Sequence, residues 1–178
     1  MIMKGKRMGN DELFNVKKLF KKDLVLLDVE CKDVFDLLNY LSNFALEKGL
    51  VYPDFKEAVI EREKSFPTGL KMPQINIAIP HTDSKYVKVP QVIVAKLKKK
   101  IIFKEMGLED NDLPVDIVFM LLINNDGHQV FLLQNIINLC MNEEISKKLL
   151  SSNSQEEIFH LIQYYYETYA EYCEDVSN

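Results

Sequence analysis

The histidine whose setting most suggests chemistry is His81, in the stretch INIAIPHTD over residues 75–83. The apolar β-formers before Pro80 predict a buried strand that ends just before the imidazole. Pro80 has a fixed φ and forces Ile79 to be extended, so the turn that presents His81 is stiff. Ligands are usually received at strand ends of an α/β sheet. His81 is therefore either a working nucleophile or a structural residue bonded to a nearby backbone carbonyl or to Asp83.

A second histidine, His128, follows a second strand end and the turn NNDG at 124–127. It begins a predicted helix over 128–141, which Asp126 is expected to cap. Free N–H groups and the helix dipole attract an anion there, and a neutral imidazole (reference pKa about 6.5) can donate a hydrogen bond to a phosphoryl oxygen. Two strand ends of one sheet can bring His81 and His128 together. The alternative is that His128 simply starts a helix.

Other kinds of site have no support in the sequence. There is no Gly-rich dinucleotide loop, phosphate loop, HExxH or GxSxG motif, and the chain has six glycines. Neither His81 nor His128 has a carboxylate or cysteine at metal-ligand spacing, so no metal and no cofactor are expected. Cys31, Cys140 and Cys173 are far apart and form no CxxC pair, which argues against a disulfide framework and a zinc site. The third histidine, at 160, lies inside an amphipathic helical pattern and is interpreted as structural.

Strands are predicted at Asp23–Val29, Ile75–Ile79, Gln91–Leu97 and Val115–Ile123. The last is apolar at nearly every position, as expected of a central strand covered on both faces. Helices are predicted at 32–48, from Pro53 to just before Pro67, at 128–141, at 143–150, and after a capping box formed by Ser154 and Glu157. Alternating strands and helices predict one α/β layered domain, with a mixed sheet of four or five strands flanked by helices.

The bulk composition is that of an ordinary globular domain, with 178 residues, 47% apolar and 28% charged. The net charge of −5 gives no general affinity for nucleic acid or anionic membranes. The longest apolar run is far shorter than the roughly 20 residues that a membrane span needs, and no signal peptide is evident. The expectation is a reduced, cytoplasmic protein without membrane insertion.

Charge is uneven at the two ends of the sequence. Residues 1–22 hold seven basic residues against two acidic ones, and residues 164–178 are rich in tyrosine and acids. The predicted division is a basic extension over 1–22, one domain over 23–163, and a Tyr-rich acidic tail over 164–178. A nucleic-acid binder using residues 1–22 is a weaker alternative, which predicts binding that falls steeply with salt.

Several motifs occur together in one order between about Asp23 and Leu161. They are EREKSFPTGL at 61–70, INIAIPHTD at 75–83, VAKL at 94–97, FKEMG at 103–107, LPVDIVFMLLI at 113–123, and HQVFLLQNIINL at 128–139. In this the chain resembles the IIA component (EIIA) of the bacterial sugar phosphotransferase system, in the mannitol/fructose-type superfamily. The PHTD ending and the F-x-x-M-G segment are similar to the galactitol branch.

The resemblance implies a phosphocarrier. In the family, the histidine after the Ile-Pro turn accepts a phosphoryl group from the histidine-containing phosphocarrier protein. It passes the group to a cysteine of the EIIB component, which phosphorylates a sugar entering through the membrane component EIIC. By motif, His81 would be the phosphoacceptor (as tele-phosphohistidine), His128 the second active-site histidine, and Arg62 a residue that stabilises phosphoryl charge. Thr68 is a candidate for substrate binding. Alternatively, Arg62 is an exposed helix charge and Thr68 a turn residue.

Partners are expected on separate chains and are expected to dock near His81, on apolar residues such as Phe66, Met72 and Ile79. Cys140 lies within an apolar helix face and is expected in the core rather than as an EIIB-type nucleophile. The competing function, implied by the same family, is a regulatory protein that signals through its phosphorylation state without serving transport.

Overall fold

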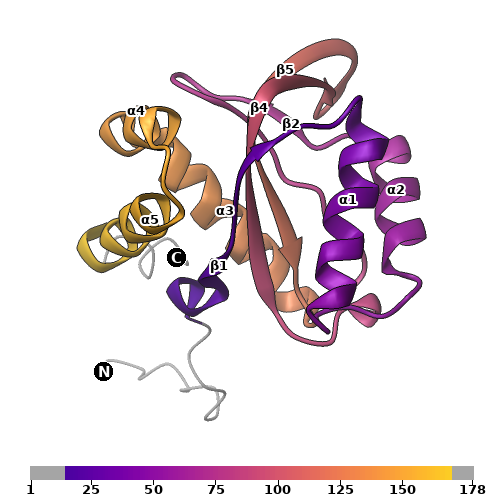
Figure 1. Ribbon diagram of the computed structural model, residues 1–178. Coiled ribbons are helices and arrows are strands. Elements are labelled where there is room, and N and C mark those ends of the chain that lie inside the picture. The colour runs from indigo at the N-terminus through magenta and orange to yellow at the C-terminus, as the bar shows by residue number, and fades with distance from the viewer. Residues whose placement is uncertain (1–14, 170–178) are drawn as a thin grey trace, which may run out of the picture.

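Five strands form one mixed sheet between two groups of helices in the computed structural model, which describes residues 15–169 (Figure 1). The strands are β1 (Phe20–Val29), β2 (Gly69–Lys71), β3 (Asn76–Ala78), β4 (Gln91–Glu105) and β5 (Leu108–Leu122). The helices are α1 (Val34–Glu47), α2 (Phe55–Ser65), α3 (Asp126–Met141), α4 (Glu143–Ser151) and α5 (Gln155–Tyr169), with short 3₁₀ turns η1 (Val16–Leu19) and η2 (Ser84–Tyr86). The predicted fold class is confirmed.

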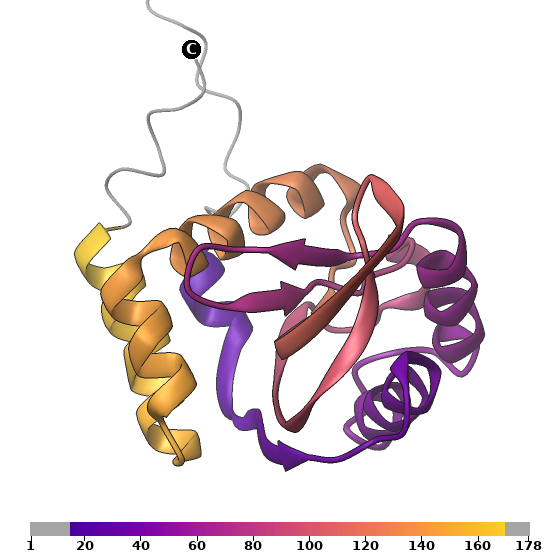
Figure 2. The same ribbon diagram turned by 90° about the horizontal axis from the view of Figure 1, so that it is seen from above.

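Strand β5 organises the sheet. It pairs antiparallel with β4 in a long hairpin and parallel with β3, while β4 pairs parallel with β1 at the other side. The short strand β2 pairs antiparallel with β3, and Figure 2 shows the two side by side. Because β3 and β5 are parallel, the segments that follow them leave the sheet at the same edge.

The two faces of β5 belong to two different apolar cores. Its even-numbered residues from 118 to 122 pack with α1 and α2, and its odd-numbered residues from 117 to 121 pack with α3, α4 and α5. Figure 1 shows these helix groups on opposite sides of the sheet. Alternating side chains of a strand point to opposite faces, so an uninterrupted apolar sequence is what a strand between two cores requires.

The predicted strands at 91–97 and 115–123 are real but too short. After an irregularity in register between Lys96 and Ile101, strand β4 resumes with buried Ile101 and Phe103. On the opposing strand, Pro114 pairs with Ile102. The exposed lysines at 98–100 and the proline interrupt the apolar pattern, so the outer half of the hairpin was missed.

Two further local predictions were wrong or incomplete. The short strand β2 was not predicted, because three residues give too little periodicity. The cap of α3 is Asn125 rather than Asp126, since the Asn125 side chain accepts a hydrogen bond from the N–H of Gly127 over 2.9 Å. The predicted cap of α5 is confirmed on one side, where Ser154 Oγ accepts from the N–H of Glu157.

Both ends of the described chain pack on the same core. Val16 and Leu19 of η1 are buried, and Tyr166 of α5 stacks on Phe20 with ring centroids 5.7 Å apart. The remaining residues of the predicted N-terminal extension and C-terminal tail, 1–14 and 170–178, lie outside the described residues. Within residues 15–169, no helix has both the length and the apolar character needed to span a membrane.

Candidate active site

His81 lies directly beyond β3 and continues its parallel pairing with β5. The register runs from Ala78 opposite Val118 to a bridge between His81 and Leu121, and the Leu121 N–H donates to the Pro80 carbonyl over 3.0 Å. The side chain of His81 is 8% exposed. The imidazole is therefore held by the sheet itself, at the strand end where it was predicted.

A hydrogen bond within the same turn sets the tautomer of His81. Its Nδ1 lies 2.7 Å from the carbonyl oxygen of Ile79. A carbonyl can only accept, so Nδ1 carries the hydrogen, and the neutral ring keeps its lone pair on Nε2. Burial lowers the pKa of His81, the bond to Ile79 opposes this, and the positive charge of Arg62 lowers the pKa further. The ring is thus neutral near pH 7, with Nε2 as the nucleophilic atom.

His128 lies in the first turn of α3, which follows the end of β5. Its side chain is half-buried, and its backbone N–H donates to the Asn125 carbonyl over 3.0 Å. Because β5 runs parallel to β3, His81 and His128 both follow strand ends at one edge of the sheet, as predicted. The N-terminus of α3, which is the positive end of the helix dipole, belongs to that edge.

Arg62 lies in the last turn of α2 and is exposed. Its guanidinium carbon lies 4.6 Å from the centre of the Phe66 ring. Its charge acts on His81, whose pKa it lowers. The structure therefore places a cation within electrostatic reach of the candidate nucleophile.

Thr68 is buried, and its hydroxyl donates to a carboxylate oxygen of Glu63 over 2.7 Å. Its backbone N–H donates to the other oxygen of the same carboxylate over 2.9 Å. The predicted direct contact of Thr68 with a substrate stays a prediction.

The buried carboxylate of Glu63 was missed by the sequence analysis. Burial raises its pKa, and the two hydrogen bonds from Thr68 oppose that shift. In a stretch reading EREKS the residue looks like one more exposed helix charge. The available signal was its place in a four-residue repeat with Phe55 and Val59, the other buried residues of α2.

The expected docking residues divide into exposed and buried ones. Phe66 is 60% exposed and fits the expectation. Ile79 is 1% exposed and faces the core, so its expected place on a docking surface was wrong. Met72 is partly buried against the same core. A further exposed apolar side chain, Val130, lies two residues beyond His128 and is 74% exposed.

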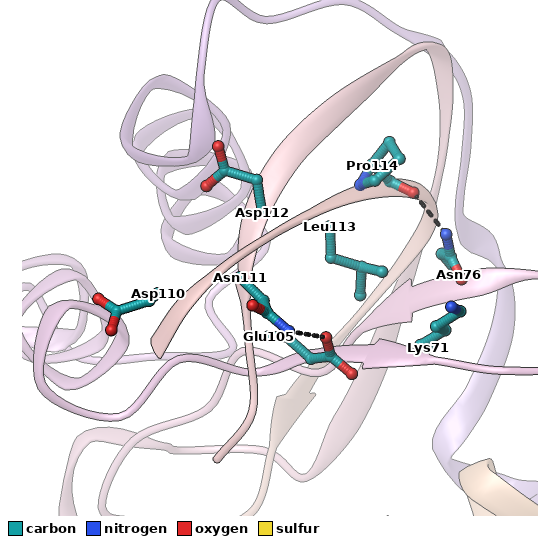
Figure 3. A pocket seen from close by; sticks show the side chains of 8 residues that line it. All are labelled: Lys71, Asn76, Glu105, Asp110, Asn111, Asp112, Leu113 and Pro114. Atoms are coloured by element: carbon teal, nitrogen blue, oxygen red, sulfur yellow. Dashed lines mark hydrogen bonds between the residues drawn. The ribbon is translucent and has the colours of Figure 1, made fainter. Parts of the chain in front are cut away.

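A hollow of about 580 Å³ lies between the β4–β5 hairpin and residues Lys71 and Asn76 of β2 and β3, and its lining includes neither histidine of the candidate site (Figure 3). Two of its acidic side chains already have partners, since Glu105 accepts from Asn111 and Asp112 pairs with Lys104. The predicted chemistry is not located in this hollow. Over residues 15–169, no cluster of three or more His, Cys, Asp or Glu side chains is arranged to hold a metal ion.

Cys140 lies in the core, as expected. Its side chain is fully buried on α3, and burial raises the pKa of its thiol to about 12. A thiol in that state is not a nucleophile near neutral pH.

Comparison with known proteins places this arrangement in a family. Residues 18–165 match the family described as phosphoenolpyruvate-dependent sugar phosphotransferase system, EIIA 2. The chain belongs to this EIIA family. The galactitol-specific EIIA component of Escherichia coli K12 is 30% identical over 119 residues, which cover 67% of this chain and 79% of that protein. The transcriptional regulator ManR of Bacillus subtilis is 32% identical over 103 residues, which cover 58% of this chain and 14% of the regulator.

Solved structures agree with the fold. The crystal structure of mannitol IIA from Escherichia coli superposes with a TM-score of 0.67 at 18% identity, covering 80% of this chain and 98% of that one. The complex of mannitol IIA with phosphorylated mannitol IIB from the same organism gives a TM-score of 0.66 at 20% identity, covering 80% of this chain and 96% of that one. The resemblance seen in the sequence motifs is thereby confirmed at the level of family and fold.

Proposed function

We propose that this EIIA protein is a sugar-specific phosphocarrier in which His81 accepts a phosphoryl group on Nε2. The donor is the histidine-containing phosphocarrier protein, and the acceptor is a cysteine of an EIIB component. The observation that supports this most directly is the 2.7 Å bond from His81 Nδ1 to the Ile79 carbonyl, because it leaves the lone pair on Nε2.

The transfer needs no separate base. As Nε2 of His81 bonds to phosphorus, the bond between phosphorus and the donor imidazole breaks in line with it, and the donor leaves as a neutral ring. The His81 ring then carries positive charge, and its Nδ1–H stays on the Ile79 carbonyl, which stabilises that charge. Transfer onward runs the same way, with a thiolate of EIIB as the attacking group.

The surroundings of His81 would balance the phosphoryl charge without trapping it. Arg62 supplies a positive charge from α2, and the side chain of His128, at the positive end of the α3 dipole, supplies a hydrogen-bond donor. A single exposed arginine is weaker than a buried arginine cluster, because solvent screens it. Moderate stabilisation suits a carrier, which must release the group it holds.

The proposed partner surface surrounds the sheet edge at His81. Phe66 and Val130 offer exposed apolar area there, and Arg62 lies over the Phe66 ring. A mannitol IIA of the same fold is solved as a complex with phosphorylated mannitol IIB, which supports EIIB as the acceptor. The galactitol-specific relative supports a galactitol-like alditol or sugar as the transported substrate, delivered by a membrane EIIC.

A regulatory role is the second candidate, and the ManR relative favours it. In that case His81 would be phosphorylated in the same way, but the phosphoryl state would be read by another domain or protein. The two roles differ in whether EIIB removes the group in the presence of a sugar.

The deciding experiment incubates the full chain with phosphoenolpyruvate, enzyme I and the phosphocarrier protein, and measures acid-labile phosphate by intact mass. One phosphoryl group is expected on the wild type and on His160→Ala, which changes an exposed histidine of α5. None is expected on His81→Ala. Loss of the group to an EIIB protein supports transport, and its retention supports regulation. Labelling of His81→Ala at the wild-type level would overturn the site.

A further inference from the structure

The carboxylate of Glu63 is connected to His81 by hydrogen bonds that are joined through the backbones of Thr68 and Ile79. Glu63 accepts from the N–H and the hydroxyl of Thr68, over 2.9 and 2.7 Å. The Thr68 carbonyl accepts from the N–H of Ile79 over 3.3 Å. The Ile79 carbonyl accepts from Nδ1 of His81 over 2.7 Å. Every group in this series except the imidazole and the carboxylate belongs to Thr68 or to the backbone.

Ile79 is the connecting residue of the series. Its N–H is held by Thr68 and its carbonyl holds the ring of His81. A displacement of Thr68 would therefore move the carbonyl that fixes the tautomer and direction of the imidazole. Pro80 restricts Ile79 to extended backbone, so the turn is stiff. A movement of Thr68 would therefore displace the ring rather than be absorbed by a change in the turn.

The use of a carboxylate at position 63 requires an explanation. Burying an ionisable group costs free energy, and the neighbouring buried residues of α2, Phe55 and Val59, are apolar. An apolar side chain would fill the same place without that cost. A side chain with two polar atoms at its end can bond both the N–H and the hydroxyl of Thr68 and so fix the position of its carbonyl, which an apolar side chain cannot do.

We propose that Glu63 is a positioning residue for His81, acting through Thr68 and Ile79 to keep the hydrogen on Nδ1 and to direct Nε2 at the incoming phosphoryl group. This rests on the proposed function in that His81 is the phosphoacceptor. It also gives Thr68 a part that requires no contact with the phosphoryl group.

Two pairs of variants separate positioning from general loss of stability. Glu63→Ala removes both acceptors, whereas Glu63→Gln keeps one acceptor for the N–H of Thr68 and can donate to its hydroxyl. Thr68→Val removes only the hydroxyl bond, and Thr68→Ser retains it. Ser146→Ala is the matched control, because Ser146 is fully buried on α4 and its hydroxyl donates to the Cys140 carbonyl over 2.6 Å.

The first readout is the tautomer of His81, measured on the full chain by ¹H–¹⁵N correlation of the labelled imidazole, with no partner present. Wild type, Glu63→Gln, Thr68→Ser and Ser146→Ala are expected to show Nδ1–H. Glu63→Ala and Thr68→Val are expected to show a mixture of tautomers. The second readout is the initial rate of phosphorylation, expected to fall about 10- to 100-fold in Glu63→Ala and to be restored in Glu63→Gln.

The outcomes distinguish this inference from the proposed function. A Glu63→Ala protein that is folded and keeps both the Nδ1–H tautomer and the wild-type rate overturns the inference. If that variant does not fold, the same two readouts are compared between Thr68→Val and Thr68→Ser. A folded Thr68→Val that keeps the Nδ1–H tautomer and the wild-type rate overturns the inference. If the variants show the expected changes of tautomer but the wild type accepts no phosphoryl group, the proposed function is overturned and the positioning inference is not.

Discussion

The Nδ1–H of His81 donates to the carbonyl of Ile79, only two residues earlier in the chain, over 2.7 Å. A bond of such short range lies within a single turn of the chain. Pro80 between the two residues has a fixed φ and holds Ile79 extended. The local turn brings the carbonyl to the ring, and the bond from the Ile79 N–H to the Thr68 carbonyl, over 3.3 Å, fixes the position of that turn.

Arg62→Ala is expected to raise the pKa of His81. Burial lowers that pKa first, and the positive charge of Arg62 lowers it further, so removing the charge removes one of the two lowering causes. In the variant, protonation of the ring, and the loss of its nucleophilic form, should begin at a higher pH than in the wild type. An NMR titration of the His81 ring measures this directly.

Lys64→Ala is the control for the Arg62 variant, because Lys64 is another exposed cation of α2. It should titrate as the wild type does. An unchanged His81 titration in Arg62→Ala would contradict electrostatic contact between the two side chains, and it would remove the basis for giving Arg62 a part in phosphoryl transfer.

The parts of the site that were predicted are those encoded by neighbouring residues. The apolar run before Pro80 and the turn before His128 locate two strand ends, and parallel pairing of β3 with β5 then places both histidines at one edge. Glu63 was not predicted, because its burial depends on how α2 packs and its partner Thr68 lies beyond the end of the helix. The residue types alone do not distinguish it from the exposed Glu61.

The fold was predicted in the same uneven way. Strand β5 was recognised where both faces are covered, since nearly every residue there is apolar, but its first residues, from Leu108 to Pro114, were missed. The outer hairpin is held by cross-strand partners such as Phe103 with Leu113, and the periodicity of a single strand does not show which residues it pairs with. Pairing between the strands therefore supplied what the local pattern lacked.

Glu63→Gln is expected to change the pH dependence of stability. The pKa of Glu63 is raised by burial, so its protonated form favours the folded state. The wild type loses this contribution as pH rises through the folded pKa, because ionisation is easier in the unfolded chain. Glutamine cannot ionise and has no such loss. Urea denaturation should show the stability of Glu63→Gln relative to the wild type increasing from about pH 4 to about pH 8.

In that comparison the pH dependence contributed by His81 is present in both proteins and largely cancels in the difference. A difference in unfolding free energy that stays flat over the whole range would mean that Glu63 titrates alike in the folded and unfolded chains. Such a result would contradict the burial of its carboxylate.

Gly69→Ala is expected to destabilise the protein by about 1–3 kcal/mol. A Cβ at this position would lie 2.6 Å from the backbone carbonyl oxygen of Lys104 and 3.2 Å from Cβ of Phe103. The backbone of β4 cannot move away without breaking strand pairing, because Gly69 pairs with Glu105 of β4 and with Ala78 of β3. Urea denaturation of the variant measures the change, and a stability within about 0.5 kcal/mol of the wild type would show that β2 lies further from β4.

Cys140 is expected to resist alkylation in the folded protein. Its thiol is fully buried and its pKa is raised to about 12, so almost no thiolate exists near pH 8. Cys31 is only half-buried, and although burial and the charges of Asp36 and Asp33 raise its pKa, iodoacetamide can reach it. Peptide mass spectrometry over a time course should therefore show Cys31 modified well before Cys140, and both modified in urea. Alkylation of Cys140 as fast as Cys31 in the native protein would mean that α3 opens readily from the core, and it would contradict the placing of this thiol as a core residue.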